Sequence, residues 1–305
     1  MVDSVVIDTE PVTKSLKKAT AKKLLNVVKY PSDDPWIVQP GDQPKLIRIE
    51  PGSTPAAPGD RAATEAASVD LRARLVALQN RLRAEEQHSV LLVLQAMDAG
   101  GKDGTIKSVF AGVDPMGVEV TAFNVPTAEE LGHDFLWRIH RRTPRHGFIG
   151  IFNRSHYEDV LAVRVRNLAP EKVWRGRYGL IRDFEKNLSE AGTTVIKIML
   201  HISFEEQALR LQERIDDSTK RWKFRIGDLD DRKLWHDYQR AYEETLAETS
   251  THHAPWYVVP ANRKWYRNWA VLTILVEALE KLDPQFPPRP DLDGLNVEEY
   301  CASKE

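Results

Sequence analysis

The chain has 305 residues, of which 42% are hydrophobic and 29% are charged, and it carries a formal net charge of −2 at pH 7. This length and composition indicate a globular, enzyme-sized protein with one large domain, and the near-neutral charge excludes a global attraction to nucleic acid or membrane. The single cysteine, Cys301, excludes an internal disulfide framework, and no apolar run reaches the ~20 residues that cross a bilayer, so we expect a cytoplasmic protein.

Residues 1–65 are predicted to form an irregular N-terminal extension. The stretches YPSDDPWIVQPGDQPK and EPGSTPAAPGD are rich in Pro, Gly, Ser and Asp, which is typical of chain that lies irregularly over a surface. Earlier in the extension, VTKSLKKATAKKLLNVV predicts a short basic helix. After Asp60, RAATEAASVDLRARLVALQNRLRAEE has apolar residues at helical spacing and no proline, so it predicts a long helix.

Five short apolar runs then alternate with helical patterns. The runs are SVLLVLQ, GVEVTAFN, GFIGIFN, TTVIKIMLHI and PWYVVPA. Strands that are nearly apolar throughout and separated by helices are typical of a parallel sheet covered on both faces. We therefore predict an α/β fold, a doubly wound, mainly parallel five-stranded sheet with helices on both faces, in a domain that spans residues 66–286. The proline-rich segment 287–305 predicts an extended C-terminal tail.

The first apolar run leads into QAMDAGGKDG, which resembles a phosphate-binding P-loop, G-x-x-x-x-G-K-[ST]. Gly101 and Lys102 are in place, whereas Ala96 stands at the first glycine and Asp103 at the hydroxyl position. A glycine loop between a strand and a helix directs backbone N–H groups and the helix N-terminus at an anion. The pattern predicts a phosphate site with Lys102 as its cation; the alternative is a tight turn that needs its glycines for backbone reasons alone. The loop residues predicted to bind substrate are Ala99, Gly100, Gly101, Asp103 and Gly104.

Two carboxylates flank this lysine. A carboxylate repels phosphate unless a cation lies between them, and Mg²⁺ is held in proteins by one or two carboxylates together with phosphate oxygens and water. Asp98 is therefore predicted to bind a metal or to handle a proton. For Asp103 we keep a second interpretation, which is capping of the following helix, because the first turn of a helix favours a negative charge.

A second polar cluster follows the third apolar run, in the stretch GIFNRSHYEDVL. Asn153 stands where P-loop phosphotransferases commonly place an acid that helps to hold magnesium. Arg154 is predicted to bind phosphate through its guanidinium group, and Glu158 and Asp159 to contact a nucleoside or to help hold the metal. The alternative is structural, because Ser155 with Glu158 three residues later forms a capping box.

A basic segment follows the fourth apolar run. SFEEQALRLQERIDDSTKRWKF begins as a capped helix and continues with cations and interleaved aromatic residues. It predicts a helical lid over about residues 208–232 that closes over phosphates and excludes water. The alternatives are a solvated charged face and a surface for single-stranded nucleic acid, the second of which the near-neutral charge disfavours. The cations are Arg210, Arg214, Lys220, Arg221, Lys223 and Arg225.

Several motifs occur together and in order: MDAGGKDG, DFLWRIHR, GIFNRSHYEDVL, LHIS, DDSTKRWKF and STHHAPWYVVPANRKW. From about Asp70 to about Phe286 the chain resembles the polyphosphate kinase 2 family, most closely its nucleotide phosphotransferase branch. The resemblance implies a P-loop kinase fold similar to thymidylate kinase. It implies an enzyme that uses inorganic polyphosphate to phosphorylate nucleoside mono- or diphosphates, AMP or ADP, in either direction. It also implies Mg²⁺ as the cofactor, with Mn²⁺ as a second option, and assembly into dimers or tetramers.

By position, the resemblance also implies roles for individual residues. The catalytic set is Asp98, which would also hold the metal, with Lys102, Arg154 and Arg210. The glycine loop would hold phosphates, and the lid cations would cover phosphate. The nucleotide side and its metal would be lined by Asn153, Arg154, Glu158 and Asp159. Within these groups the substrate-binding residues are Ala99, Gly100, Gly101, Asp103, Gly104, Asn153, Glu158, Asp159, Arg214, Lys220, Arg221 and Lys223.

The chain departs from the family pattern at Ala96, where glycine is usual, and at Arg182, where Asn is expected. Two other functions share the same features. An ATP-dependent nucleoside monophosphate kinase would have the same loop, lid and fold and would differ in its phosphoryl donor. A catalytically silent polyphosphate-binding protein would bind the polymer without turnover.

Overall fold

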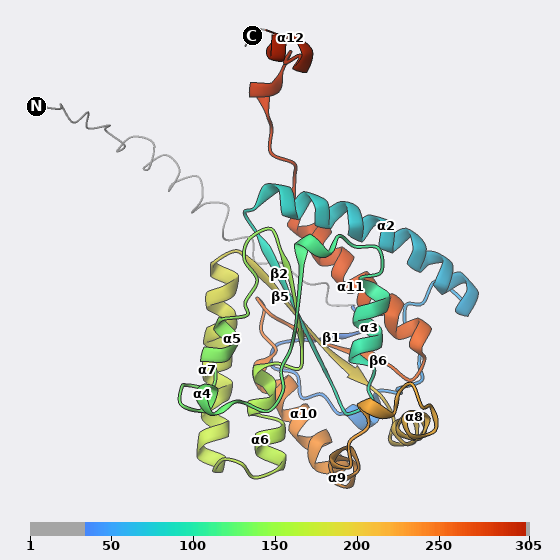
Figure 1. The fold of residues 1–305 in the computed structure, drawn as a ribbon. Helices are drawn as coiled ribbons and strands as arrows, with labels where there is room; N and C mark the ends of the chain where they lie inside the picture. Colours follow the sequence, from blue (N-terminus) through green and yellow to red (C-terminus); the bar gives the residue numbers. More distant parts are fainter. Residues whose placement is uncertain (1–33, 303–305) are drawn as a thin grey trace, which may run out of the picture.

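A six-stranded sheet forms the centre of the computed structural model, which describes residues 34–302 (Figure 1). The strand order is β1-β6-β5-β2-β4-β3, and every neighbouring pair is parallel except β1 with β6. The predicted mainly parallel α/β sheet is confirmed, with one strand more than the five expected. The five predicted strands are β2 (Ser89–Ala96), β3 (Val118–Ala122), β4 (Ile149–Asn153), β5 (Thr193–His201) and β6 (Trp256–Pro260).

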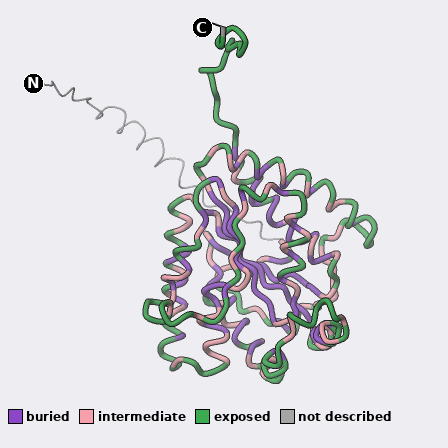
Figure 2. Tube along the Cα trace, in the orientation of Figure 1, coloured by how far each residue is buried: buried purple, intermediate pink, exposed green. Residues whose placement is uncertain are grey.

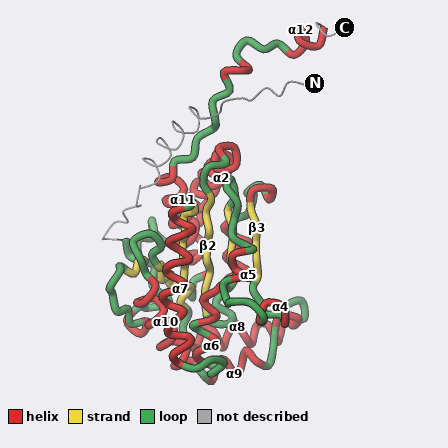
Figure 3. Tube along the Cα trace, turned by 90° about the vertical axis from the view of Figure 1, so that its left-hand side faces the viewer, coloured by secondary structure: helices red, strands yellow, loops and turns green. Residues whose placement is uncertain are grey.

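Helices cover both faces of this sheet, as Figures 1 and 3 show from two directions. On one face α11 (Lys264–Leu282) packs against α2 (Arg61–Glu85) and α3 (Lys102–Val109). On the other face α7 (Glu171–Glu190) packs against β5 and against α10 (Trp235–Thr249). The remaining elements are α4 (Ala128–Leu131), α5 (Trp137–His140), α6 (Ala162–Val165), α8 (Phe204–Asp216), α9 (Gly227–Lys233), α12 (Val297–Ala302) and the 3₁₀ turns η1 (Leu46–Arg48), η2 (Pro115–Gly117), η3 (His156–Asp159), η4 (Arg221–Lys223) and η5 (Pro290–Leu292).

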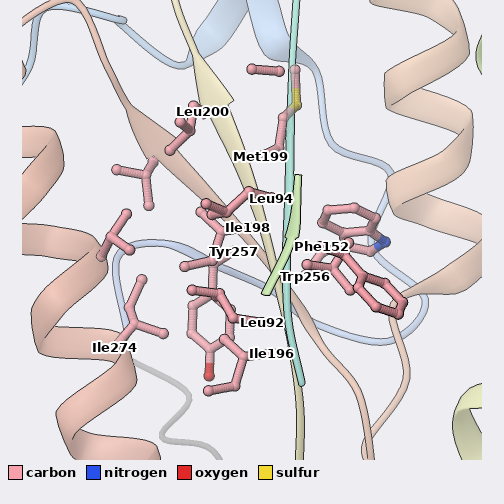
Figure 4. Packing of buried hydrophobic residues seen from close by; sticks show 14 of the residues in the cluster. Leu92, Leu94, Phe152, Ile196, Ile198, Met199, Leu200, Trp256, Tyr257 and Ile274 are labelled. Carbon is pink, nitrogen blue, oxygen red and sulfur yellow. The ribbon is translucent and has the colours of Figure 1, made fainter. Parts of the chain in front are cut away.

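The hydrophobic core lies on both sides of the sheet and runs along its central strands (Figure 2). All eight residues of β2 are buried, because helices cover both of its faces. Leu94 and Ile198 point toward α11, where Ile274 meets this layer, and Phe152 and Trp256 point to the opposite face (Figure 4). This packing fixes the carboxyl ends of β2, β4 and β5 at one edge, where an α/β sheet places its ligand site.

The sixth strand, β1 (Ile37–Val38), belongs to the segment that the sequence predicts as irregular extension. It pairs antiparallel with β6, with Ile37 opposite Tyr257. The chain then continues irregularly as far as Asp60, whose side chain accepts a hydrogen bond from Ala63 N and begins α2. The basic helix predicted from VTKSLKKATAKKLLNVV lies outside the described residues.

This segment, residues 34–60, packs closely on the domain. Trp36 is 5% exposed, and its indole Nε1 donates to the Tyr266 hydroxyl at 2.8 Å. The same hydroxyl donates to the carbonyl of Pro55 at 2.7 Å, and Asn262 N donates to Pro51 O at 3.1 Å. The segment therefore braces the start of α11 as well as the edge of β6.

The C-terminal tail runs away from the body after α11 and ends in the short helix α12 (Figures 1 and 3). Over residues 34–302, no helix combines the length and the apolar character needed to span a membrane.

Candidate active site

The glycine loop lies between the end of β2 and the start of α3. Gly101 caps α3 in the left-handed conformation, with φ of 104°. Gly100 is required by space, because a Cβ there would lie 2.4 Å from the Cβ of Ala96. Ala99 adopts a positive φ of 60°, whereas Ala96 does not, so alanine at the first P-loop position costs no backbone strain. The strain in this loop is at Ala99, and strain of this kind is typical of functional loops.

Lys102 is the first residue of α3 and is 9% exposed. Its Nζ donates to the carbonyl of Ala96 at 3.1 Å, so the side chain folds back across the loop. Burial, followed by the charge of Arg154, lowers the Lys102 pKa to about 8, against the opposing effect of Asp98. A cation with a lowered pKa is poised to gain an anionic partner, because phosphate would offset the desolvation.

Asp98 and Arg154 form an ion pair between adjacent strand ends. The Arg154 backbone N donates to Leu94 O at 3.2 Å, which holds the end of β4 against β2. Arg154 adopts a positive φ of 63°, and its Nη2 donates to Asp98 Oδ1 at 2.8 Å. Burial would lower the Arg154 pKa, but the charges of Glu158 and Asp98 raise it. The structure thus brings together three of the residues that the sequence singles out.

Asp103 connects the loop to two other parts of the predicted site. Its Oδ1 accepts from Asn153 Nδ2 and its Oδ2 from Lys223 Nζ, each at 2.8 Å. Burial would raise the Asp103 pKa, but the hydrogen bonds from Lys223 and Asn153 lower it below the ordinary value. Asp103 lies in the first turn of α3, where its negative charge is favoured, but its side chain bonds Asn153 and Lys223 rather than a backbone N–H group of the helix. Lys223 therefore ties the basic segment to the glycine loop.

Glu158 and Asp159 occupy different surroundings although they are adjacent in the sequence. With its amide nitrogen toward Glu158, Gln95 donates to Glu158 Oε1 at 3.1 Å. Burial raises the Glu158 pKa, against the charges of Arg154 and Lys102. Asp159 instead accepts from Arg177 Nη1 at 2.9 Å, and burial raises its pKa to about 6. Glu158 thus faces the loop, whereas Asp159 is held by α7.

The predicted capping box forms only in part. Ser155 Oγ accepts from Tyr157 N at 3.2 Å and caps the turn η3. Glu158 lies in this turn, but its side chain bonds Gln95 on β2. Ser155 therefore has a structural role, whereas the Glu158 side chain takes no part in capping and stays near the glycine loop.

A fully buried polar network supports this turn from beneath the sheet. Lys197 Nζ, in the middle of β5, donates to Glu185 Oε2 at 2.6 Å, to the Tyr157 hydroxyl at 3.0 Å and to Thr249 O at 2.7 Å. The Tyr157 hydroxyl donates to Glu185 Oε1 at 2.7 Å. Both side chains of the ion pair are 0% exposed. The network ties β5, α7 and α10 to the residue that precedes Glu158.

Arg210 lies beneath the glycine loop, and all five of its N–H groups donate to protein acceptors. Nε donates to Glu206 Oε1 at 2.7 Å. Nη1 donates to the carbonyls of Ala99 and Gly100, and Nη2 to those of Ala261 and Asn262, at 2.6–3.2 Å. With 6% of its surface exposed, Arg210 connects the loop to the end of β6. This geometry favours a positioning role over the direct contact with phosphate that we expected.

The other cations of the basic segment divide into two groups. Arg214 Nη1 donates to Asp228 Oδ2 at 3.3 Å, and this pair links α8 to α9 near the loop. Lys220 pairs with Asp217 at 2.8 Å and Arg221 donates to Ile215 O at 2.6 Å, so both bind within their own segment. Of the predicted lid cations, Lys223 reaches the loop and Lys220 and Arg221 do not.

Asp98 is the carboxylate beside the glycine loop that could hold a divalent metal ion. No group of three or more His, Cys, Asp or Glu side chains suited to a metal gathers within residues 34–302. Mg²⁺ commonly takes one or two carboxylates and completes its shell with phosphate oxygens and water. Asp98 provides one carboxylate beside the loop, and its charge adds to burial in raising the pKa of both Glu158 and Asp228. Asp98 therefore interacts electrostatically with each of these two acids, although the three do not gather into one group of metal ligands.

Sequence reasoning missed several residues that shape the site. Gln207 Nε2 donates to the carbonyl of Asp98 at 3.0 Å, and Gln95 and Asp228 contribute as described above. Gln95 could have been singled out from the sequence, because it is an amide side chain near the end of an otherwise apolar strand. Arg267 lies against the glycine loop, but its Trp-rich segment predicts a core helix and gives no local indication of this position.

Comparisons with known proteins identify the family of this chain. The family model described as Polyphosphate kinase 2 (PPK2) matches residues 59–287. The chain is 58% identical, over 82% of its length and 94% of the relative, to an AMP/ADP-polyphosphate phosphotransferase of Meiothermus ruber. It is 46% identical, over 70% of its length and 78% of the relative, to an ADP-polyphosphate phosphotransferase of Rhodopseudomonas palustris.

A solved structure carries the same fold. The crystal structure of Polyphosphate Kinase 2 from Arthrobacter aurescens TC1 superposes with a TM-score of 0.80 at 42% identity, covering 92% of this chain and 95% of that one. The family match extends over strands β2 to β6, the glycine loop and the basic segment. The chain therefore belongs to the polyphosphate kinase 2 family.

Proposed function

We propose that this protein is a polyphosphate-dependent nucleotide kinase, which transfers phosphoryl groups from inorganic polyphosphate to AMP, ADP or both, reversibly and with Mg²⁺. One observation carries the proposal. The glycine loop with Lys102 stands beside the Asp98–Arg154 pair at adjacent strand ends, in a chain 58% identical to an AMP/ADP-polyphosphate phosphotransferase.

Phosphoryl transfer needs positioning and charge neutralisation, and little covalent chemistry from the protein. Lys102 and Arg154 supply cations close to Asp98, and the N-terminus of α3 supplies backbone N–H groups. Asp98 would hold Mg²⁺, with Mn²⁺ as a substitute, and the ion would neutralise charge on the transferred group. The pKa of Lys102, near 8, leaves the side chain mostly protonated at neutral pH, so it is ready to donate to phosphate.

The two sides of the loop suit different substrates. Asn153 and Glu158, at the β4 side, would face the nucleotide, and Arg210 would hold the loop in shape. Lys223, which already bonds Asp103, would carry the lid over the bound phosphates together with Arg214. A lid of this kind excludes water from the transferred phosphoryl group. We also propose that the protein works in the cytoplasm as a dimer or tetramer.

Product analysis tests this function directly. Purified protein, Mg²⁺ and long-chain polyphosphate are mixed with AMP or with ADP, and the nucleotides are separated by chromatography. We expect ADP or ATP to appear only when polyphosphate is present. Product from AMP and ATP without polyphosphate would identify an ATP-dependent kinase instead, and binding of polyphosphate without product would identify a silent binder.

A matched pair of variants identifies the site. Lys102→Met should lower kcat by about 100-fold or more, the scale for losing one donor that faces developing charge. Lys107→Met removes the same charge from an exposed position on the same helix and should leave kcat unchanged. Equal rates for both variants would remove Lys102 from the mechanism.

A further inference from the structure

Arg267 is a buried cation that the mechanism above does not use. It lies near the start of α11, and only 3% of its surface is exposed. Its Nε and Nη2 both donate to the side-chain oxygen of the neighbouring Asn268, at 3.0 and 2.7 Å. Its Nη1 has no hydrogen-bond acceptor among residues 34–302. Two strong donor N–H groups are therefore held in place without a partner.

The guanidinium group lies against the glycine loop. A Cβ on Gly101 would be 2.0 Å from Arg267 Nη1, and a Cβ on Gly104 would be 3.6 Å from Nη2. Gly101 is the N-cap of α3 and Gly104 lies in its first turn, and the absence of side chains at both positions allows the arginine to approach the helix N-terminus. The unpartnered donors are thus at the end of α3 that attracts anions.

The charge around Arg267 is unbalanced. Within residues 34–302 no carboxylate pairs with Arg267. The charged group beside it is Arg210, whose Nη1 lies 3.4 Å from the same Cβ position on Gly101 and whose own charge is paired with Glu206. Burial, followed by the charge of Arg210, lowers the Arg267 pKa to about 10. A buried cation without a counter-ion is costly, and an anionic ligand is what would offset that cost.

We infer that Arg267 binds the polyphosphate chain, with Nη1 donating to an oxygen of a phosphate group on the α11 side of the glycine loop. This inference rests on the proposed function. The choice of polyphosphate over nucleotide follows from the charges on the two sides of the loop. On the β4 side Arg154 is already paired with Asp98 and also interacts with Glu158, and on the α11 side Arg210 is paired with Glu206. Within residues 34–302 Arg267 pairs with no carboxylate, so the α11 side keeps an uncompensated positive charge. A polyphosphate chain extends past the reacting phosphate and can therefore reach the α11 side of the loop.

Binding without turnover tests the inference. Affinities for polyphosphate of one defined chain length and for ADP are measured separately by calorimetry, on the unaltered protein and on Arg267→Met and Arg267→Gln. Loss of a charge-assisted donor should weaken polyphosphate binding about tenfold or more in both variants. ADP affinity should stay unchanged. Arg263→Met is the control, because it removes the same charge from the exposed N-cap of the same helix, where Arg263 Nε donates to Gly52 O at 2.8 Å.

Thermal unfolding without ligand separates binding from a structural role. Removal of an unpaired buried cation should leave the Tm of Arg267→Met equal or higher, while the rise in Tm caused by polyphosphate becomes smaller. Unaltered polyphosphate affinity in either folded variant, or an equal loss of ADP affinity, would overturn the inference. If the unaltered protein binds polyphosphate but makes no nucleotide product, the proposed function fails and the binding comparison still decides the role of Arg267.

Discussion

The buried pair Lys197–Glu185 allows a sharp test of how the site is supported. Lys197 Nζ has three protein acceptors and is completely buried, and Glu185 receives hydrogen bonds from Lys197 and Tyr157. The Lys197→Met substitution keeps the length of the side chain and removes the charge. It leaves the Glu185 carboxylate buried without its counter-ion, and it leaves Thr249 O without a donor from Lys197.

The magnitude follows from that geometry. Breaking a buried pair by removing one partner costs about 3–5 kcal/mol of unfolding free energy, and we expect this for Lys197→Met and for Glu185→Leu. The double variant contains no unpaired charge, so it should cost about as much as one single variant rather than the sum. The expected coupling energy is therefore about 3–5 kcal/mol, at or above the upper end for residues in contact.

Urea unfolding of the unaltered protein, the two single variants and the double variant measures this coupling energy as a double-mutant cycle. Lys186→Met is the control on α7, the helix that carries Glu185, because the salt bridge of Lys186 with Glu190 is long, 3.8 Å, and exposed. That variant should differ from the unaltered protein by less than about 1 kcal/mol. Additive effects of the two core substitutions, within about 0.5 kcal/mol, would refute the claim that the network acts as a unit.

Three further predictions concern the glycine loop. Lysine cannot make the five hydrogen bonds of Arg210, two of which go to loop carbonyls, two to the carbonyls that follow β6 and one to Glu206. Arg210→Lys should therefore lower the unfolding free energy by about 2–3 kcal/mol and raise the KM for polyphosphate, measured by urea unfolding and steady-state kinetics. Because the Lys102 pKa is about 8, Lys102 loses its proton as the pH rises from about 7 to about 9, and polyphosphate affinity measured by calorimetry should weaken over this range. The affinity of Lys102→Met should not show this weakening, because the variant lacks the titrating amine. Asp103→Ala breaks a partly exposed ion pair with Lys223, so the unfolding free energy should change by less than about 1 kcal/mol, whereas the KM for polyphosphate should change. A large fall in Tm with an unchanged KM would contradict this prediction.

The long strands and the loop could be predicted because their signals are local. An apolar run with Val and Leu predicts β2, and Gly101 with Lys102 immediately after it predicts an anion site. β1 could not be predicted in the same way, since two residues, Ile37 and Val38, carry no periodicity. That strand exists because β6 offers a free edge, which is a tertiary property.

The roles of the cations were harder to predict, because composition does not say where a guanidinium points. Arg210 belongs to a basic run in sequence, yet its donors go to backbone carbonyls across the fold. Arg267 lies among tryptophans that predict a core helix, yet it approaches the loop because Gly101 and Gly104 lack side chains. Lys197 lies in an apolar strand, and its partners come from α7, η3 and the end of α10. Such long-range partners leave no mark in a local pattern.

The segment of residues 34–60 has a practical consequence for anyone who trims the protein. A fragment cut to the family match, residues 59–287, would lose Trp36 and the paired strand β1. The hydrogen-bonding groups of β6 would then be open along one side, and an open strand is a template for pairing with another molecule. Such a fragment should self-associate on purification and lose the brace on Tyr266, one residue before Arg267. Thus a boundary drawn by similarity would damage both solubility and the polyphosphate side of the site.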